Sequence, residues 1–231
     1  MDVFKFREPL VWAQVGGTRV ITPRGLKCLH PRRIRAGALD DLGRDSGSWV
    51  FVDVGFSREG RTGGLLVHDG HPRELTFAQL MAELVALAMG GSKPLNLVLE
   101  APLSAAFTDA GNPAGRAMEK DETGHRYWYA GLGCQVTVAA AYLVRAILEA
   151  KPRRDIRLFE AFISFKGKSN RSTHAADVLA MRAVAWGLPL AVGSVVSPDK
   201  VAGPHAVRVQ SAFRVFGFDC QVPPVIVARV E

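Results

Sequence analysis

The chain has 231 residues, of which 48% are hydrophobic and 22% are charged, and this balance excludes disorder over the whole length. The formal net charge of +7 favours an anionic partner such as nucleic acid, but it is equally compatible with a charge that only keeps the protein in solution. The three cysteines are far apart and form no CxxC pair, so neither a zinc ribbon nor a disulfide framework is indicated.

The first 47 residues indicate a basic, irregular extension. Short strands are expected at 10–15 and 19–22, joined by Gly16 and Gly17. The start of the sequence lacks the charged-then-apolar pattern of a signal peptide, and no apolar stretch reaches the length of a bilayer span. We therefore expect a cytoplasmic protein with no membrane partner.

Regular patterning begins at residue 48. Residues 48–56 are a near-continuous run of β-branched and aromatic side chains, which is typical of a buried strand. A second strand is expected at 63–68, followed by the hairpin dipeptide Asp69-Gly70 and a third strand at 73–76. These three strands are predicted to form an antiparallel meander.

Helices and strands then alternate. Apolar residues at helical spacing predict helices at 77–89 and 135–150, and buried strands are expected at 95–100 and 155–165. A third helix is expected at 173–186, with a serine or threonine as its cap. Strands joined through a helical crossover run parallel. The prediction is an α/β fold whose mixed sheet has a three-strand meander followed by two parallel strands, with flanking helices.

The domain organisation follows from these patterns. Residues 48–190 are expected to form the core, and 191–231 a C-terminal β-hairpin extension packed on it. Residues 104–134 are expected to be a long connection without regular structure, which is unusual in a compact domain and often functional or disordered.

Three acidic residues occupy similar places in the predicted sheet. Asp53 lies inside the first core strand, Glu100 ends the strand at 95–100, and Glu160 lies late in the next one. A carboxylate in an apolar run is costly to bury unless it is paired or binds a cation. Because parallel strands bring their carboxyl ends to one edge of a sheet, we expect these acids to share that edge.

A further acid comes from the third helix. His174 and Asp177 are three residues apart in its first turn and so share a helix face, where the helix dipole favours an acid. Each of these residues taken singly is more typical of a structural role: a solvated strand end, a helix start, a surface cap or an arginine partner. Together they predict a functional cluster.

Converging carboxylates bind hard cations such as Mg²⁺ or Mn²⁺ through oxygen. Two such ions about 4 Å apart can activate water and stabilise the leaving oxygen in phosphodiester hydrolysis. The expected cofactor is therefore Mg²⁺ or Mn²⁺, with two ions bound.

The order of elements and three short motifs resemble the ribonuclease H-like superfamily. The motifs are Val52-Asp53-Val54-Gly55, Leu99-Glu100-Ala101-Pro102 and the His-x-x-Asp pair of His174 and Asp177. The resemblance extends over about residues 48–190 and is nearest to RuvC-type junction resolvases and to an uncharacterised prokaryotic group of predicted ribonuclease H-like nucleases.

This resemblance implies metal-dependent cleavage of a nucleic acid. Asp53, Glu100 and Asp177 would be the metal ligands, and His174 or Glu160 would be an auxiliary ligand or a water-orienting group. The chain departs from the pattern after Glu160, where the expected proline is missing, and 1–47 and 191–231 have no counterpart.

Basic residues near these motifs are candidates for gripping a phosphate backbone. They are Lys166, Lys168 and Arg171 before the third helix, and Arg116 and Arg126 in the long connection. Aromatic neighbours of Arg126 could stack on bases. A solvated loop is the alternative for the first group, and a loop folded onto the body of the protein is the alternative for the second.

The leading hypothesis is thus a nuclease that hydrolyses phosphodiester bonds of DNA or RNA by a two-metal-ion mechanism. One alternative is a non-catalytic nucleic-acid-binding protein that retains the same fold, and another is a partner-binding module that uses the basic extension. An actin-like ATPase is disfavoured because a second glycine-rich phosphate loop is missing. The sequence leaves open the choice of DNA or RNA and the oligomeric state, a homodimer included.

Overall fold

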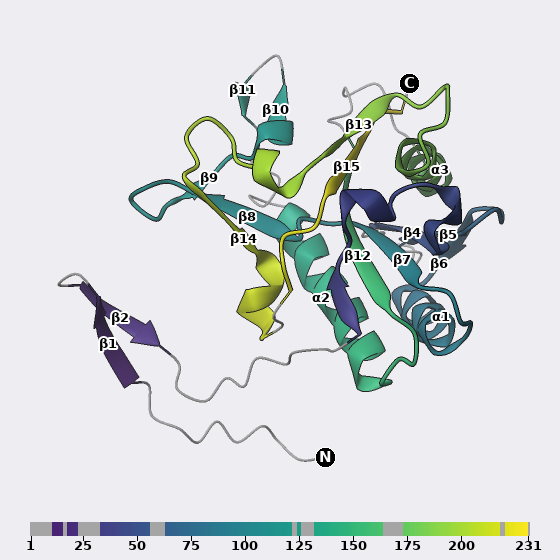
Figure 1. The fold of residues 1–231 in the computed structure, drawn as a ribbon, viewed down its shortest axis with the longest axis horizontal. Helices are drawn as coiled ribbons and strands as arrows, with labels where there is room; N and C mark the ends of the chain where they lie inside the picture. The colour runs from purple at the N-terminus through teal and green to yellow at the C-terminus, as the bar shows by residue number, and fades with distance from the viewer. Residues whose placement is uncertain are drawn as a thin grey trace.

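The computed structural model has an α/β architecture built around a mixed sheet of eight strands (Figure 1). It describes residues 11–15, 18–22, 33–55, 63–121, 124–125, 132–163, 173–217 and 220–230. The strands of the main sheet are, in spatial order, β13 (Gly193–Val196), β15 (Val225–Ala228), β12 (Ile156–Ile163), β7 (Leu95–Glu100), β4 (Ser48–Val54), β5 (Gly63–Val67) and β6 (Arg73–Leu75), with β3 (Ile34–Ala36) also beside β12. The α-helices are α1 (Phe77–Met89), α2 (Leu132–Glu149) and α3 (His174–Ala185).

The centre of the sheet has the predicted topology. β4, β5 and β6 pair antiparallel in sequence order, which confirms the meander. β7 pairs parallel with β4, and β12 pairs parallel with β7, so both strand–helix crossovers are confirmed. α1 begins where expected because Thr76 and Gln79 form a reciprocal capping box at its first turn.

Helices cover both faces of the sheet (Figure 1). Val52 and Leu99 face one side and belong to the apolar core that includes Leu84 of α1 and Leu143 of α2. Their strand neighbours, such as Phe51 and Val98, belong to a second core that includes Val178 and Met181 of α3. Because side chains alternate along a strand, successive residues of one strand meet opposite helix layers.

Both chain ends contribute to the main sheet. β3 and β15 both pair parallel with β12, β3 along its first half and β15 along its second half. β13 then pairs antiparallel with β15 at the sheet edge. The main sheet therefore includes residues from within 1–47 and from within 191–231.

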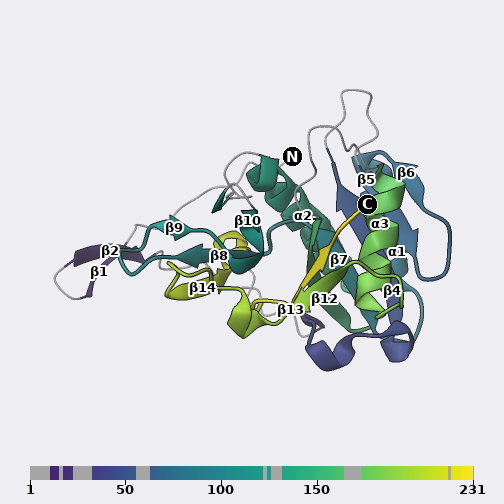
Figure 2. The ribbon, with the colours of Figure 1, turned by 90° about the horizontal axis from the view of Figure 1, so that it is seen from above.

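The long connection after β7 has more regular structure than its sequence suggested. β8 (Ser104–Phe107) pairs with β9 (Pro113–Ala114) and with β14 (Arg208–Ser211), which makes a second, three-stranded sheet to one side of the main one (Figure 2). The prediction of a structureless loop at 104–134 was therefore wrong. It failed because β8 finds its main partner, β14, about a hundred residues further along the chain, a pairing that no local pattern reveals.

The remaining elements are short. They are the antiparallel pairs β1 (Val11–Val15) with β2 (Thr18–Thr22) and β10 (Lys120–Asp121) with β11 (Gly124–His125), and the 3₁₀ helices η1 (Leu39–Asp41), η2 (Arg44–Ser46), η3 (Ala117–Glu119), η4 (Pro198–Lys200) and η5 (Ala212–Phe216). The first of these pairs confirms the hairpin predicted near the N-terminus.

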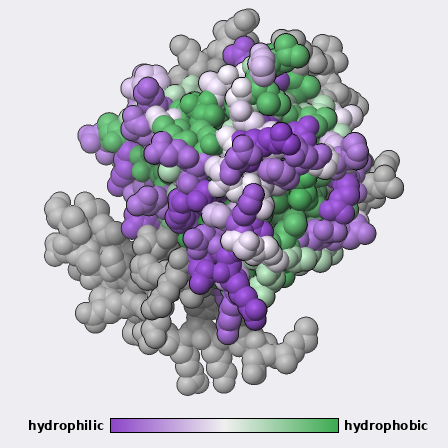
Figure 3. All heavy atoms as spheres, turned by 45° about the vertical axis from the view of Figure 1, so that its right-hand side comes forward, coloured by the Kyte–Doolittle hydropathy of each residue, from purple (hydrophilic) through white to green (hydrophobic). Residues whose placement is uncertain are grey.

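The surface is mixed in character. Hydrophilic side chains spread over much of the face in Figure 3, with smaller apolar areas between them. Across the described ranges, none of the helices combines the length and the apolar character needed to cross a bilayer.

Candidate metal centre

Asp53 and Glu100 come from two adjacent parallel strands. They are direct partners in the register of β4 and β7, so their side chains leave the sheet on the same face. Each lies near the carboxyl end of its strand. Asp53 is only 5% exposed, whereas Glu100 is partly accessible. The predicted common edge for these two acids is confirmed.

Asp177 reaches the same place from α3. The side chain of Thr173 accepts a hydrogen bond from the backbone N–H of Ala176 and so fixes the start of the helix. α3 packs against β4 and β5, and Asp177 in its first turn is 3% exposed. The carboxylates of Asp53, Glu100 and Asp177 each offer an oxygen, and these oxygens lie within 4.8 Å of one another.

His174 contacts the cluster through Asp53. Its Nδ1 lies 2.5 Å from Oδ2 of Asp53. This hydrogen bond is the main reason that the pKa of His174 is raised. Burial lowers that pKa, whereas the negative charges of Asp53, Glu74 and Asp177 raise it further. A protonated His174 carries a positive charge beside the acids and so partly offsets their mutual repulsion.

Two glycines make room for His174. A Cβ atom at Gly55 would clash with Cε1 of the His174 ring, and one at Gly64 would lie 2.9 Å from the Cβ of His174. Gly64 is the β5 partner of Asp53 in the sheet register. A larger residue at Gly55 would displace the His174 ring, and one at Gly64 would press on the backbone of the first turn of α3.

The donor set suits a hard divalent cation. Carboxylate oxygens are the ligands that Mg²⁺, Mn²⁺ and Ca²⁺ prefer, and a cation relieves the cost of holding like charges together in a largely buried place. Within the described part of the chain, this is the one group of three or more His, Cys, Asp or Glu side chains that is close enough to share an ion. The cluster can therefore hold a metal ion.

Glu160 is not part of this cluster, contrary to the expectation that its carboxylate shares the site. Its β7 partner is Leu99, whereas Glu100 is paired with Ala161, so Glu160 faces the opposite side of the sheet. There it is fully buried, and its carboxylate accepts hydrogen bonds from Arg116 at 2.5 Å and from the backbone N–H of Leu103 at 2.9 Å. Burial raises the pKa of Glu160, while Arg116 acts against that rise.

Arg116 was expected to grip a phosphate backbone and does not lie where it could do so. It is 0% exposed and forms ion pairs with Glu160 and with Glu119, which is equally buried. The guanidinium is thus enclosed by carboxylates of the same chain. The other expected phosphate contacts, Lys166, Lys168, Arg171 and Arg126, lie outside the described residues.

This buried Arg116–Glu119–Glu160 network was missed from the sequence. A glutamate in the buried strand β12 does imply a partner, because an unpaired buried charge is costly. However, the sequence holds many arginines, and the one that pairs with Glu160 is 44 residues away along the chain. Only the placement of the second sheet identifies it.

No protein-family model matches the chain, and searches of curated proteins and of solved structures likewise found no match. What the protein does must therefore be inferred from the arrangement of its own residues.

Proposed function

We propose that this protein is a Mg²⁺- or Mn²⁺-dependent nuclease of the ribonuclease H-like kind, with Asp53, Glu100 and Asp177 as its metal ligands. The observation that carries the proposal is the convergence of three carboxylates from β4, β7 and α3 within 4.8 Å. The central strand order, β6-β5-β4-β7-β12 with a leading meander, supports the same assignment. The positive net charge fits a polyanionic substrate.

Each site residue has a distinct task in this proposal. Asp53 and Glu100 supply oxygens from rigid strands, and Asp177 closes the site from the first turn of α3. His174 holds Oδ2 of Asp53 and so fixes the orientation of that carboxylate. The divalent ions, when bound, supply Lewis-acid activation of the phosphodiester and neutralise its developing charge. Glu160 has no catalytic task here, because its carboxylate is on the other face of the sheet.

The test is cleavage of single-stranded, duplex and branched DNA and of RNA by the purified chain. We expect cleavage with Mg²⁺ or Mn²⁺, none in EDTA, and a loss of more than about 100-fold in the variants Asp53→Asn and Asp177→Asn. Asp45→Asn is the matched control, since Asp45 is an exposed acid in η2 and should behave as wild type. Equal cleavage in EDTA would rule the proposal out.

The same samples separate the non-catalytic alternative. A chain that cleaves nothing but binds nucleic acid with a steep salt dependence, and does so equally well as Asp53→Asn, is a binding protein that retains the fold. A chain that neither cleaves nor binds nucleic acid at physiological salt is neither a nuclease nor a nucleic-acid-binding protein.

A further inference from the structure

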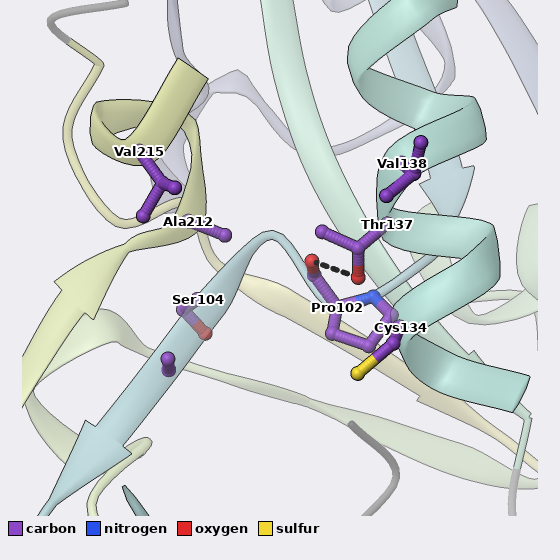
Figure 4. A pocket seen from close by; sticks show the side chains of 8 residues that line it. Pro102, Ser104, Cys134, Thr137, Val138, Ala212 and Val215 are labelled. Atoms are coloured by element: carbon purple, nitrogen blue, oxygen red, sulfur yellow. Dashed lines mark hydrogen bonds between the residues drawn. The ribbon is translucent and has the colours of Figure 1, made fainter. Parts of the chain in front are cut away.

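Hydrogen bonds hold the backbone of the segment that follows Glu100, residues 101–103. The Ala101 N–H donates to the carbonyl of Leu99, the carbonyl of Pro102 accepts from the Thr137 hydroxyl at 3.0 Å (Figure 4), and the Leu103 N–H donates to Glu160. Ala101 and Leu103 are at most 1% exposed. The backbone that leaves the metal ligand is therefore held by α2 on one side and by β12 on the other.

The contact between β12 and this segment is made by a buried, ion-paired carboxylate. Glu160 accepts both the Leu103 N–H and the Ser104 hydroxyl, and Arg116 donates to the same hydroxyl at 2.9 Å. Arg116, Glu119 and Glu160 are all 0% exposed. Hydrogen bonds to charged groups are stronger than neutral ones, and the low dielectric of the interior strengthens them further. This is a stiff support at the first residues after Glu100.

The Thr137 tie borders an open cavity of about 250 Å³ between the start of α2, the segment 102–105 and η5 (Figure 4). Pro102, Ser104 and Thr137 line it. The segment after Glu100 is thus not backed by dense packing along its whole length. Its position is fixed by these hydrogen bonds together with the burial of Ala101 and Leu103 in the apolar core.

We propose that Glu160, locked by Arg116, is a positioning residue that fixes the place of the Glu100 carboxylate in the metal site. The inference rests on the proposed function in that it takes Glu100 as a metal ligand. Ligands must be held within roughly 0.5 Å of their working geometry, and removal of a supporting group usually weakens metal binding by about 10-fold to 100-fold. Glu160 thereby acts on the metal from the opposite face of the sheet, without touching it.

Two variants loosen the two ties separately. Glu160→Gln keeps the size of the side chain but offers only one acceptor oxygen, so it loses a bond to either Leu103 or Arg116. Thr137→Val keeps the shape and removes the hydroxyl, which lies within hydrogen-bond distance of the carbonyls of both Pro102 and Gly133. Val144→Ala, a core truncation further along α2, is the control that lowers stability without touching either tie.

The measurements are the affinity for Mn²⁺ alone, by calorimetry or electron paramagnetic resonance well below the melting temperature, and the hydrogen exchange of the Leu103 amide. We expect Mn²⁺ to bind about 10-fold more weakly to Glu160→Gln and about threefold more weakly to Thr137→Val. Faster exchange at Leu103 should accompany the weaker binding in Glu160→Gln. Val144→Ala should match the wild-type affinity despite its lower melting temperature.

The outcomes separate the two proposals. A wild-type chain that binds no Mn²⁺ overturns the proposed function and this inference with it. A wild-type chain that binds Mn²⁺, with both tie variants equal to it in affinity, overturns the positioning role alone and leaves Arg116–Glu160 as a structural staple. Should Glu160→Gln fail to fold, Ser104→Ala replaces it, because it removes the hydroxyl that donates to Glu160 and accepts from Arg116. A wild-type Mn²⁺ affinity in Ser104→Ala would then overturn the positioning role.

Discussion

The imidazole of His174 lies 2.5 Å from Oδ2 of Asp53, although the two residues are 121 positions apart in the chain. Asp53 belongs to a central strand and His174 to the first turn of α3, so this bond joins the sheet to the helix that supplies Asp177. The charges of the three acids and of His174 therefore depend on one another.

The pH dependence of stability should report the His174–Asp53 bond. The pKa of His174 is raised, chiefly by that hydrogen bond, so the folded protein binds the proton more tightly than the unfolded chain does. The hydrogen bond should contribute its full stabilisation of the folded state below the ordinary imidazole pKa of about 6.5. This contribution should be lost as the pH rises through the raised pKa of His174. In EDTA at low pH, wild type should exceed His174→Gln by about 1–2 kcal/mol in the free energy of unfolding.

Urea unfolding of both proteins from about pH 5.5 to about pH 9 checks this sign. His71→Gln removes an exposed histidine and serves as the control for the loss of an imidazole elsewhere on the protein. A difference between wild type and His174→Gln that grows with pH would contradict the assignment.

Removal of one acid should stabilise the metal-free protein. Glu100→Gln deletes one of three like charges that lie within 4.8 Å, so we expect the melting temperature in EDTA to rise by about 2–4 °C, equivalent to about 1 kcal/mol. Mn²⁺ at 100 times its dissociation constant should stabilise wild type by about 2.7 kcal/mol and should hardly affect the variant. Melting curves with and without Mn²⁺ measure both effects, and a variant that is destabilised in EDTA would speak against repulsion in the cluster.

The close approach of α3 to the sheet should depend on Gly64. In Gly64→Ala the new Cβ would lie 2.9 Å from the Cβ and 3.0 Å from the carbonyl oxygen of His174, so the first turn of α3 must move. We expect a loss of about 1–3 kcal/mol in stability and weaker Mn²⁺ binding. Gly90→Ala, at the end of α1, is the control, because its Cβ would meet only a carbonyl at 3.3 Å. Unchanged Mn²⁺ affinity in Gly64→Ala would show that Asp177 tolerates the shift.

Arg154 offers the opposite case, a residue important for stability alone. It is 7% exposed and donates to the carbonyls of Leu87, Gly90 and Pro94, which lie beyond the amino end of β7, away from the acids. Arg154→Ala should cost about 2–3 kcal/mol, since three partly buried hydrogen bonds lose their charged donor. The Mn²⁺ affinity of the folded variant should equal that of wild type. Denaturant unfolding measures the loss of stability, and calorimetric titration of the folded variant measures its Mn²⁺ affinity. A lower affinity would mean that the two ends of the sheet are coupled.

Local patterns in the sequence determined most of the fold. The bounds of α1 and β7 agree with those expected from apolar spacing, because burial on one or both faces dictates which side chains a strand or helix can carry. The parallel direction of β7 and β12 followed from the crossovers alone. From these directions came the convergence of Asp53, Glu100 and Asp177, which needs only a shared edge and a helix start beside it.

Strand register was decided only by the tertiary structure. Glu100 and Glu160 look equivalent in sequence, each late in a buried strand, yet the pairing of Glu100 with Ala161 turns Glu160 to the other face. The side-chain period of a strand is two, so an offset of one residue reverses the face, and no local pattern fixes the offset between two strands joined by a helix. The position of Arg116 also depends on a distant pairing: its backbone is bridged to Ala202, and its side chain points inward to Glu160 rather than out to a phosphate.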